Sequence, residues 1–446
     1  MSCEKIANFG KLNSAVRRIE LIWPMLFPRK TSLFTLGKAA IYGLTLFATT
    51  QISFAAYYDT LPKGVRMLAL KQVRTGNIQS AFNRQQQEQP YFFRINLDSS
   101  SLEGFNESAK NIFAQLKAIS QEAYEEFSFG EYQAKGTADV KVNGAGLAYG
   151  LSNRLTLYGT FPWYDARVNL QIARTKQNNH KEVARTLEAQ GNSGQAQIIS
   201  EIANQLPDVT GEVIQSVVVN GFNYQPLGNW QGEGMGDMEL GAIYRLTNWD
   251  YAGLALSGGL ILPTGREDDP DILQDFGFGD GQTDAFVEFG GGYTLPFWTN
   301  MSFDSFVRYT YQFEHERVLR VPESSDYPYG SESLVFQEKL GNMWDWRTTA
   351  NLQLRRWIGF SAGFLYNYIG LASYDSPNEF ANQVHARETE IVQETVRLGA
   401  HFSTVPLYKS GDFFLPFNCN LTAQRIIGGQ NTPTYSRYDV EFRFYF

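Results

Sequence analysis

Hydrophobic and polar residues alternate over long stretches of this chain. Between Trp298 and Glu316 one face carries Met301, Phe303, Val307, Tyr309, Tyr311 and Phe313, and the other carries Ser302, Asp304, Arg308, Thr310, Gln312 and Glu314. The stretch RYDVEFRFYF places Tyr438, Val440, Phe442, Phe444 and Phe446 on one face and Arg437, Asp439, Glu441, Arg443 and Tyr445 on the other. Side chains of a β-strand point alternately to opposite sides, so both stretches are predicted strands with one apolar and one polar face.

The same pattern predicts about twelve strands along the chain. They lie at 64–74, 138–150, 153–168, 235–247, 250–262, 282–295, 298–314, 342–356, 357–371, 390–404, 412–427 and 436–446. Many are about ten residues or longer, which suits a tilted transmembrane strand, whereas the strands of soluble sandwiches are usually shorter.

The connections between these strands alternate in length. The long connections are 75–137, 169–234, 263–281, 315–341, 372–389 and 428–435, and the short ones are LSN, TNWD, LPFWT, RRW and TVPLYKSGD. Outer-membrane barrels have long loops outside the cell and short turns in the periplasm. We therefore predict an all-β protein, a transmembrane antiparallel barrel over 56–446, in the bacterial outer membrane with lipid and lipopolysaccharide around it.

The first 55 residues have the features of a secretory signal peptide. Arg29, Lys30 and Lys38 precede the apolar run Ala39–Thr50, and the small residues Ser53 and Ala55 fit a cleavage site after Ala55. The run is too short for a spanning helix, which needs about 20 apolar residues.

Composition adds little to this picture but excludes some classes of function. The mean hydropathy of −0.30 averages out the alternation of a barrel, so it does not argue for a soluble protein. No basic patch follows the signal peptide, which argues against a nucleic-acid partner. Cys419 alone remains beyond the predicted cleavage site and Cys/His zinc spacing is absent, so we predict no disulfide, metal or cofactor.

Two of the long loops contain helical patterns. Apolar residues recur at helical spacing in 100–127 and in two pieces of 171–206, which GNSG separates. These helices either capture hydrophobic solutes or simply cap the barrel. The candidates for capture are Phe105, Ile112, Phe113, Leu116, Ile198 and Ile202.

The polar faces of the strands predict a charged lumen. The candidates for lining it are Asp304, Arg308, Asp345, Arg347, Arg397, His401, Arg437, Asp439, Glu441 and Arg443, with Asp237, Glu239, Arg245, Asp284, Glu288, Glu314 and Arg355 as further inward positions. Buried charges must be paired or hydrated, so they form either a polar path for solutes or a neutralising network that stiffens a narrow barrel.

Catalysis has weak support in this sequence. His401 and Ser403 share a strand face, but no third residue is placed to orient the histidine, so we predict that the protein is not an enzyme. The acidic, glycine-rich stretch Arg266–Asp284 could bind calcium or bridge to lipopolysaccharide through divalent ions, but it lacks the EF-hand pattern. We interpret it as a solvated loop.

Several hairpins resemble a known family. GMGDMELGAIYRLTNWDYAGLALSGGLILPTGR (Gly234–Arg266), LPKGV (Leu61–Val65) and GLAYGLSNRLTLYGTFPW (Gly146–Trp163) are similar to the outer-membrane proteins named for the MetA pathway of phenol degradation, which are related in architecture to hydrocarbon and fatty-acid channels. The resemblance implies passage of small hydrophobic or aromatic solutes. Phe446 with its alternate aromatic residues is similar to the signal that barrels present to the barrel assembly machinery.

These observations predict a channel for passive uptake of small, mainly hydrophobic or aromatic solutes. One alternative is a closed surface barrel whose loops serve adhesion or binding, and another is a lipid-modifying enzyme. The short stretch AYYDTLP before the first strand differs from the pore-plugging N-terminal segment of the fatty-acid transporters. A loop such as 100–127 could fold inward as a gate instead.

Overall fold

The computed structural model describes residues 58–90, 92–99, 107–205, 212, 215, 217–323 and 330–446. The predicted signal peptide, 1–55, lies outside these residues and stays a prediction.

Twelve strands form a closed antiparallel barrel, which confirms the predicted fold class. They are β1 (Arg66–Thr75), β5 (Ser128–Ser152), β6 (Leu155–Lys176), β8 (Met238–Asn248), β9 (Ala252–Leu262), β10 (Asp284–Thr294), β11 (Met301–Gln312), β14 (Met343–Arg355), β15 (Ile358–Ile369), β17 (Ile391–Ser403), β18 (Phe417–Gln430) and β20 (Ser436–Tyr445). Strand β20 pairs with β1 from Arg437↔Thr75 to Tyr445↔Met67, and this pairing closes the ring. Closure leaves no free edge between the strands, so a bilayer can surround them.

The two faces of the strands separate as the alternation predicts. On β20, Tyr438, Val440 and Phe442 are exposed on the outside of the barrel, while Asp439 and Glu441 are buried inside. The other strands repeat this arrangement with exposed Phe289, Val307, Trp344, Trp346, Leu398 and Leu421. An apolar outer band around a polar interior is the architecture of bacterial outer-membrane barrels.

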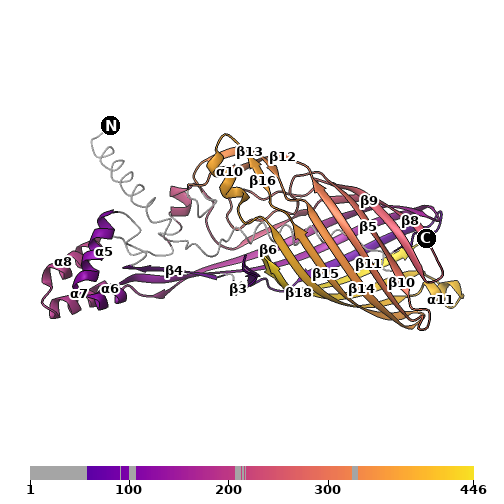
Figure 1. Ribbon diagram of the computed structural model, residues 1–446, viewed down its shortest axis with the longest axis horizontal. Coiled ribbons are helices and arrows are strands. Elements are labelled where there is room, and N and C mark those ends of the chain that lie inside the picture. Colours follow the sequence, from indigo (N-terminus) through magenta and orange to yellow (C-terminus); the bar gives the residue numbers. More distant parts are fainter. Residues whose placement is uncertain are drawn as a thin grey trace.

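Strands β5 and β6 run well past the barrel as a two-stranded ribbon (Figure 1). Strand β4 (Phe92–Asp98) pairs with the projecting part of β5, and β7 (Trp230–Met235) pairs with β6. The predicted strands 138–150 and 153–168 are therefore too short, because 128–137 and 169–176, which were assigned to long, partly helical loops, are also strand. Few large apolar side chains mark 128–137, so the sequence pattern does not extend the strand that far.

Four helices lie at the far end of the ribbon, which we call the tip (Figure 1). They are α5 (Glu107–Ile119), α6 (Gln121–Glu126), α7 (His180–Ala189) and α8 (Ser193–Gln205). Phe113, Phe127, Leu187 and Ile199 are buried in the tip, and the rings of Phe113 and Phe127 lie 5.2 Å apart. Helices α5 and α6 therefore point away from the barrel, and the hypothesis that 100–127 folds inward as a gate is wrong for these helices. None of the helices in the described part of the chain is both long and apolar enough to cross a bilayer.

Smaller elements complete the two ends of the barrel. On the outer side, β12 (His315–Arg320), β13 (Ser333–Lys339) and β16 (Ser373–Asp375) form a sheet beside α10 (Glu379–Ala386), while β2 (Ser80–Phe82), β3 (Glu88–Pro90) and β19 (Thr432–Thr434) form another, and η1 (Val217–Gly221) is a π-helical turn. At the opposite end, α11 (Val405–Lys409) occupies the turn before β18, so this strand begins at Phe417 and not at the predicted 412.

Candidate functional site: an aromatic plug above a charged cavity

The loop at 263–283 occupies the outer mouth of the barrel. Its Phe276 and Phe278 are buried against lumen-facing residues of three strands, namely Val73, Val140, Val142, Tyr164 and Ala166. The Phe278 ring stacks on Tyr164 at 5.2 Å, and the Phe276 ring lies 5.2 Å from Trp230. We call Tyr164, Trp230, Phe276 and Phe278 the aromatic plug.

Arg266 holds the plug loop in its folded shape. Its Nη1 and Nη2 donate to the Asp275 carboxylate at 2.9 and 2.6 Å, and its guanidinium lies 4.7 Å from the Phe278 ring centre and 5.4 Å from that of Trp230. Asp275 and Asp280 are both buried. The prediction that 266–284 is a solvated acidic loop is therefore wrong, because its apolar side chains draw it into the mouth together with its carboxylates.

A second carboxylate group fixes the base of this loop. Asp237 Oδ1 accepts a hydrogen bond from the Gly265 N–H at 2.8 Å, and its Oδ2 accepts one from the Asp280 N–H at 3.3 Å. Burial raises the pKa of Asp237 to about 6, and burial together with Asp284 and Asp237 raises the pKa of Asp280 well above its ordinary value. A Cβ on Gly279 would overlap the Asp237 carboxylate, so glycine permits this close approach.

Two arginines of β12 tie the plug loop to the neighbouring sheet. Arg317 Nη1 donates to Glu338 Oε2 at 3.0 Å, and Arg317 also pairs with Asp268 of the loop. Arg320 Nη2 pairs with Asp271 at 2.7 Å. Glu338 is fully buried and accepts a further hydrogen bond from the Tyr374 hydroxyl at 2.6 Å. We call the contacts of Arg317 with Glu338 and Asp268, together with the Arg320–Asp271 pair, the latch.

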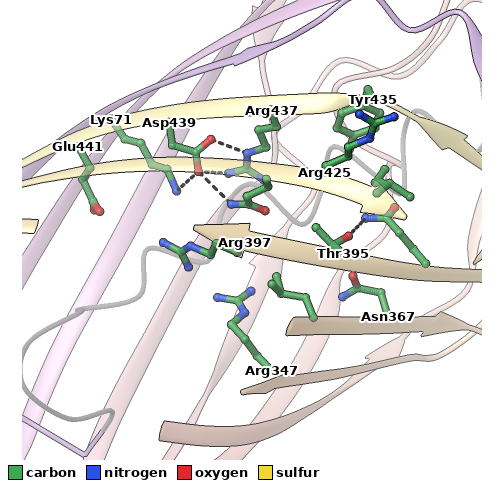
Figure 2. A pocket seen from close by; sticks show the side chains of 14 residues that line it. Lys71, Arg347, Asn367, Thr395, Arg397, Arg425, Tyr435, Arg437, Asp439 and Glu441 are labelled. Atoms are coloured by element: carbon green, nitrogen blue, oxygen red, sulfur yellow. Dashed lines mark hydrogen bonds and ion pairs between the residues drawn. The ribbon is translucent and has the colours of Figure 1, made fainter. Parts of the chain in front are cut away.

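A small cavity lies within the lumen, lined by residues of β1, β14, β15, β17, β18 and β20 (Figure 2). Its volume is about 40 Å³, which is room for about three water molecules. The charged groups at its wall include Lys71, Arg347, Arg397, Arg437, Asp439 and Glu441. We call this space the charged cavity.

Both carboxylates of the cavity already have cationic partners. Arg437 Nε and Nη2 donate to the two oxygens of Asp439 at 2.6 and 2.9 Å, and the Lys71 Nζ lies 3.7 Å from Asp439 Oδ2. Arg443 Nε and Nη2 donate to the two oxygens of Glu441 at 2.9 Å each. Bidentate geometry of this kind makes the strongest charged hydrogen bonds.

Two carboxylates, Glu239 and Asp345, lie on the adjoining wall of the lumen together with Arg308. Arg308 Nη2 pairs with Glu239 Oε2 at 2.8 Å, the Tyr158 hydroxyl donates to Glu239 Oε1 at 2.7 Å, and the Arg308 guanidinium lies 3.7 Å from the Phe286 ring centre. Asp345 accepts a hydrogen bond from Asn367, which also lines the cavity. The lumen therefore has an acidic wall and a basic wall.

Five of the ten lumen candidates line the charged cavity, namely Arg347, Arg397, Arg437, Asp439 and Glu441. Arg308 and Asp345 belong to the acidic wall and Arg443 supports Glu441, while Asp304 accepts a hydrogen bond from Asn351 and His401 contacts Gln353 Oε1. Sequence reasoning missed Lys71 and the plug residues. The signal for Lys71 was a single cation among Met67, Ala69 and Val73 on one face of β1.

The capture candidates at the tip have mixed positions. Phe113 and Leu116 are buried in its core, whereas Ile198 is 37% exposed. Phe105 and the side chains of Ile112 and Ile202 lie outside the described part of the chain. Capture of solute by the tip stays a prediction, and for Phe113 and Leu116 it requires the tip to open.

No protein-family model matches the chain, and no curated protein matches its sequence. Among solved structures, an outer membrane channel from Pseudomonas putida F1 aligns with 87% of this chain and 98% of its own at 13% identity and a TM-score of 0.48. The Pseudomonas putida toluene transporter TodX aligns with 89% of this chain and 92% of its own at 10% identity and a TM-score of 0.33. The CymD monoaromatic hydrocarbon channel aligns with 86% of this chain and 89% of its own at 10% identity and a TM-score of 0.33. These similarities concern the general barrel architecture, and the site is interpreted from this chain's own residues.

Proposed function

We propose that the protein is a passive outer-membrane channel for small, mainly hydrophobic or aromatic solutes. The observation that carries this proposal is the aromatic plug, which lies inside the outer mouth and above a charged cavity within the same lumen. The solute class is also the one that the sequence resemblance implies.

The plug suggests how such a solute would enter. Aromatic pairs contribute about 0.5–1.5 kcal/mol beyond their buried area. An aromatic solute that stacks on Tyr164 or Trp230 replaces the contacts of Phe276 and Phe278 with similar ones, which offsets part of the cost of displacing these two rings. A solute without an apolar face offers no such exchange, and the mouth stays closed to it.

Passage below the plug requires side-chain movement. A cavity of about 40 Å³ does not hold an aromatic ring. Long side chains such as Lys71 and Arg397 can rotate away at little cost in bonded strain, because their torsions have several staggered minima. The solute then crosses the lumen driven only by its own concentration gradient.

The surroundings of His401 and Ser403 support a channel over an enzyme. His401 Nε2 contacts Gln353 Oε1 at 2.9 Å, and Ser403 Oγ accepts a hydrogen bond from the Val405 N–H at 3.3 Å. A nucleophile needs a base within hydrogen-bond reach and a group that orients this base. The two side chains are engaged with other partners, so we propose no catalytic role for them.

The exterior of the barrel supports the proposed partners. Exposed aromatic and aliphatic residues encircle it, as contact with outer-membrane lipid and lipopolysaccharide requires. Phe446 is 65% exposed beside β1, where it is available as a signal to the barrel assembly machinery. The projecting tip supports one alternative, a surface role in adhesion or binding that would not need an open lumen.

Solute influx into proteoliposomes tests the proposal. The refolded chain beginning at Ala56 is compared with protein-free liposomes, using phenol and a monosaccharide as solutes. Phenol influx above the protein-free rate, with little sugar entry, is the expected result. Equal entry of both solutes would indicate a general pore, and entry of neither through folded protein would favour the surface role.

A further inference from the structure

We propose that the charged cavity binds the carboxylate of a solute, so that the channel favours small aromatic carboxylates over neutral aromatics. This inference rests on the proposed channel function and names the solute class more narrowly.

The first argument is the balance of charge around the cavity. Five cations line it, Lys71, Arg347, Arg397, Arg425 and Arg437, against the two carboxylates Asp439 and Glu441. Glu441 is held by Arg443 from the same strand, so Asp439 is the one lining carboxylate left for these five cations. A buried excess of positive charge is costly without a counter-ion, and a bound anion supplies one.

Arg397 provides the second argument. Its Nη2 donates to Thr422 Oγ1 at 3.2 Å, while its buried Nε has no hydrogen-bond partner. Within the described part of the chain, no carboxylate oxygen lies within 4.0 Å of its guanidinium nitrogens. An arginine with unused donors beside a cavity can bind both oxygens of a carboxylate in fork geometry.

Other cations face the same space. Figure 2 shows the head groups of Lys71, Arg397 and Arg347 turned into the cavity, with Asp439 between Lys71 and Arg437. Glu239 on the adjoining wall pairs with Arg308, and Asp345 accepts a hydrogen bond from Asn367. Within the residues that the structure describes, neither carboxylate lies within 4.0 Å of the Arg397 guanidinium nitrogens.

The position of the plug sets the shape of the solute. Val73 packs against the plug and Lys71 lines the cavity, and the two are two positions apart on β1, which is about 7 Å along a strand. The cavity has room for a carboxylate group but not for a ring. The solute's ring would therefore lie toward the plug and its carboxylate among the cations of the cavity.

Single-channel reversal potentials in planar bilayers test this inference. A gradient of potassium benzoate at pH 7 gives the permeability ratio of benzoate to potassium. We expect a ratio above one for the wild type, and a fall of at least about threefold for Arg397→Gln and for Lys71→Gln, because charged residues at a constriction set ion selectivity. Arg397→Lys keeps the charge and should retain most of the preference. Arg84→Gln removes an exposed outer arginine and should leave the ratio unchanged.

The outcomes separate this inference from the channel function. If benzoate shows no preference over potassium and Arg397→Gln changes nothing, while phenol still enters proteoliposomes, the carboxylate site is rejected and the channel stands. If neither phenol nor benzoate passes through folded protein, both are rejected. If Arg397→Gln lowers the conductance for benzoate and potassium equally and leaves their permeability ratio unchanged, the arginine acts through packing, and the carboxylate site is again rejected.

Discussion

The outer mouth and the charged cavity lie along the same strands but have opposite chemistry. Val73 and Lys71 both face the lumen from β1 with one residue between them, yet Val73 is buried by two phenylalanines and Lys71 lies near Asp439. Val142 and Tyr164 repeat the apolar character on β5 and β6, and Arg437 and Asp439 repeat the charged character on β20. The polarity of a lumen position thus depends on what fills the barrel at that depth, a protein loop in one case and water or solute in the other.

The two regions also differ in how they would respond to a solute. The mouth is closed by apolar burial, which contributes about 1.5–3 kcal/mol for each fully buried phenylalanine. The cavity has cations that gain a partner when an anion arrives. A solute that enters therefore replaces aromatic contacts of the plug at the mouth, and it forms new contacts with cations at the cavity.

The largest effect should follow removal of the plug. Phe276→Ala with Phe278→Ala takes away two buried side chains at about 3–5 kcal/mol each. The loop then loses its hold on the barrel wall, and single-channel conductance should rise several-fold while benzoate preference persists at the cavity. Phe414→Ala, at an 83% exposed turn residue, is the matched control. Unchanged conductance in the double variant would show that the plug does not limit flow.

Breaking the latch should have the next largest effect. Arg317→Gln leaves fully buried Glu338 without its cation, which costs about 3–5 kcal/mol when one partner of a buried pair is removed. Protease cleavage within 263–283 should become faster. Arg356→Gln breaks an exposed pair with Asp412, worth about 0–1 kcal/mol, and should leave the cleavage rate unchanged. Equal cleavage rates in the two variants would show that the latch does not hold the plug loop in the mouth.

A smaller effect is expected from pH. Because the pKa of Asp237 is about 6 with the loop closed and near 3.8 when exposed, the closed loop binds the proton more tightly. The closed form of the plug loop is thus favoured below about pH 4, and it loses this stability as the pH rises to about 6. The carboxylates of Glu267, Asp280 and Asp284 face Asp237. They repel its charged form and so favour its protonated form in the closed loop.

Conductance measured from pH 4 to 7.5 checks this sign. It should rise up to about pH 6 and level off above it, and Asp237→Asn should flatten most of the rise. Asp412→Asn, at an exposed turn, should keep the wild-type profile. If the conductance of Asp237→Asn still rises with pH as in the wild type, groups other than Asp237 cause the pH dependence.

The smallest effect on transport should come from the tip. Leu187→Ala removes a fully buried side chain of α7 and should destabilise the tip by about 2–5 kcal/mol. Because the tip lies away from both mouth and cavity, phenol influx and conductance should equal the wild type within error. A large loss of influx would instead support capture of solute by the tip, as the sequence predicts for Ile198.

Sequence reasoning reached the barrel because lipid on one side and a polar lumen on the other impose alternation on every spanning strand. It also placed Arg397, Arg437 and Asp439 inside for the same reason. It missed the plug because Phe276 and Phe278 lie in an acidic, glycine-rich loop, whose composition resembles that of a solvated one. It missed the ribbon because 128–137 (SFGEYQAKGT) has few large apolar side chains, so no apolar period of two marks the strand there.

The long ribbon sets how far the protein reaches from the membrane. Strand β5 continues about ten residues beyond Ala138, where Ile78 last bridges to it, and a strand rises about 3.3 Å per residue. The tip therefore stands roughly 30 Å above the barrel rim. At that distance, molecules too large to enter the barrel can contact the tip helices without reaching the channel mouth.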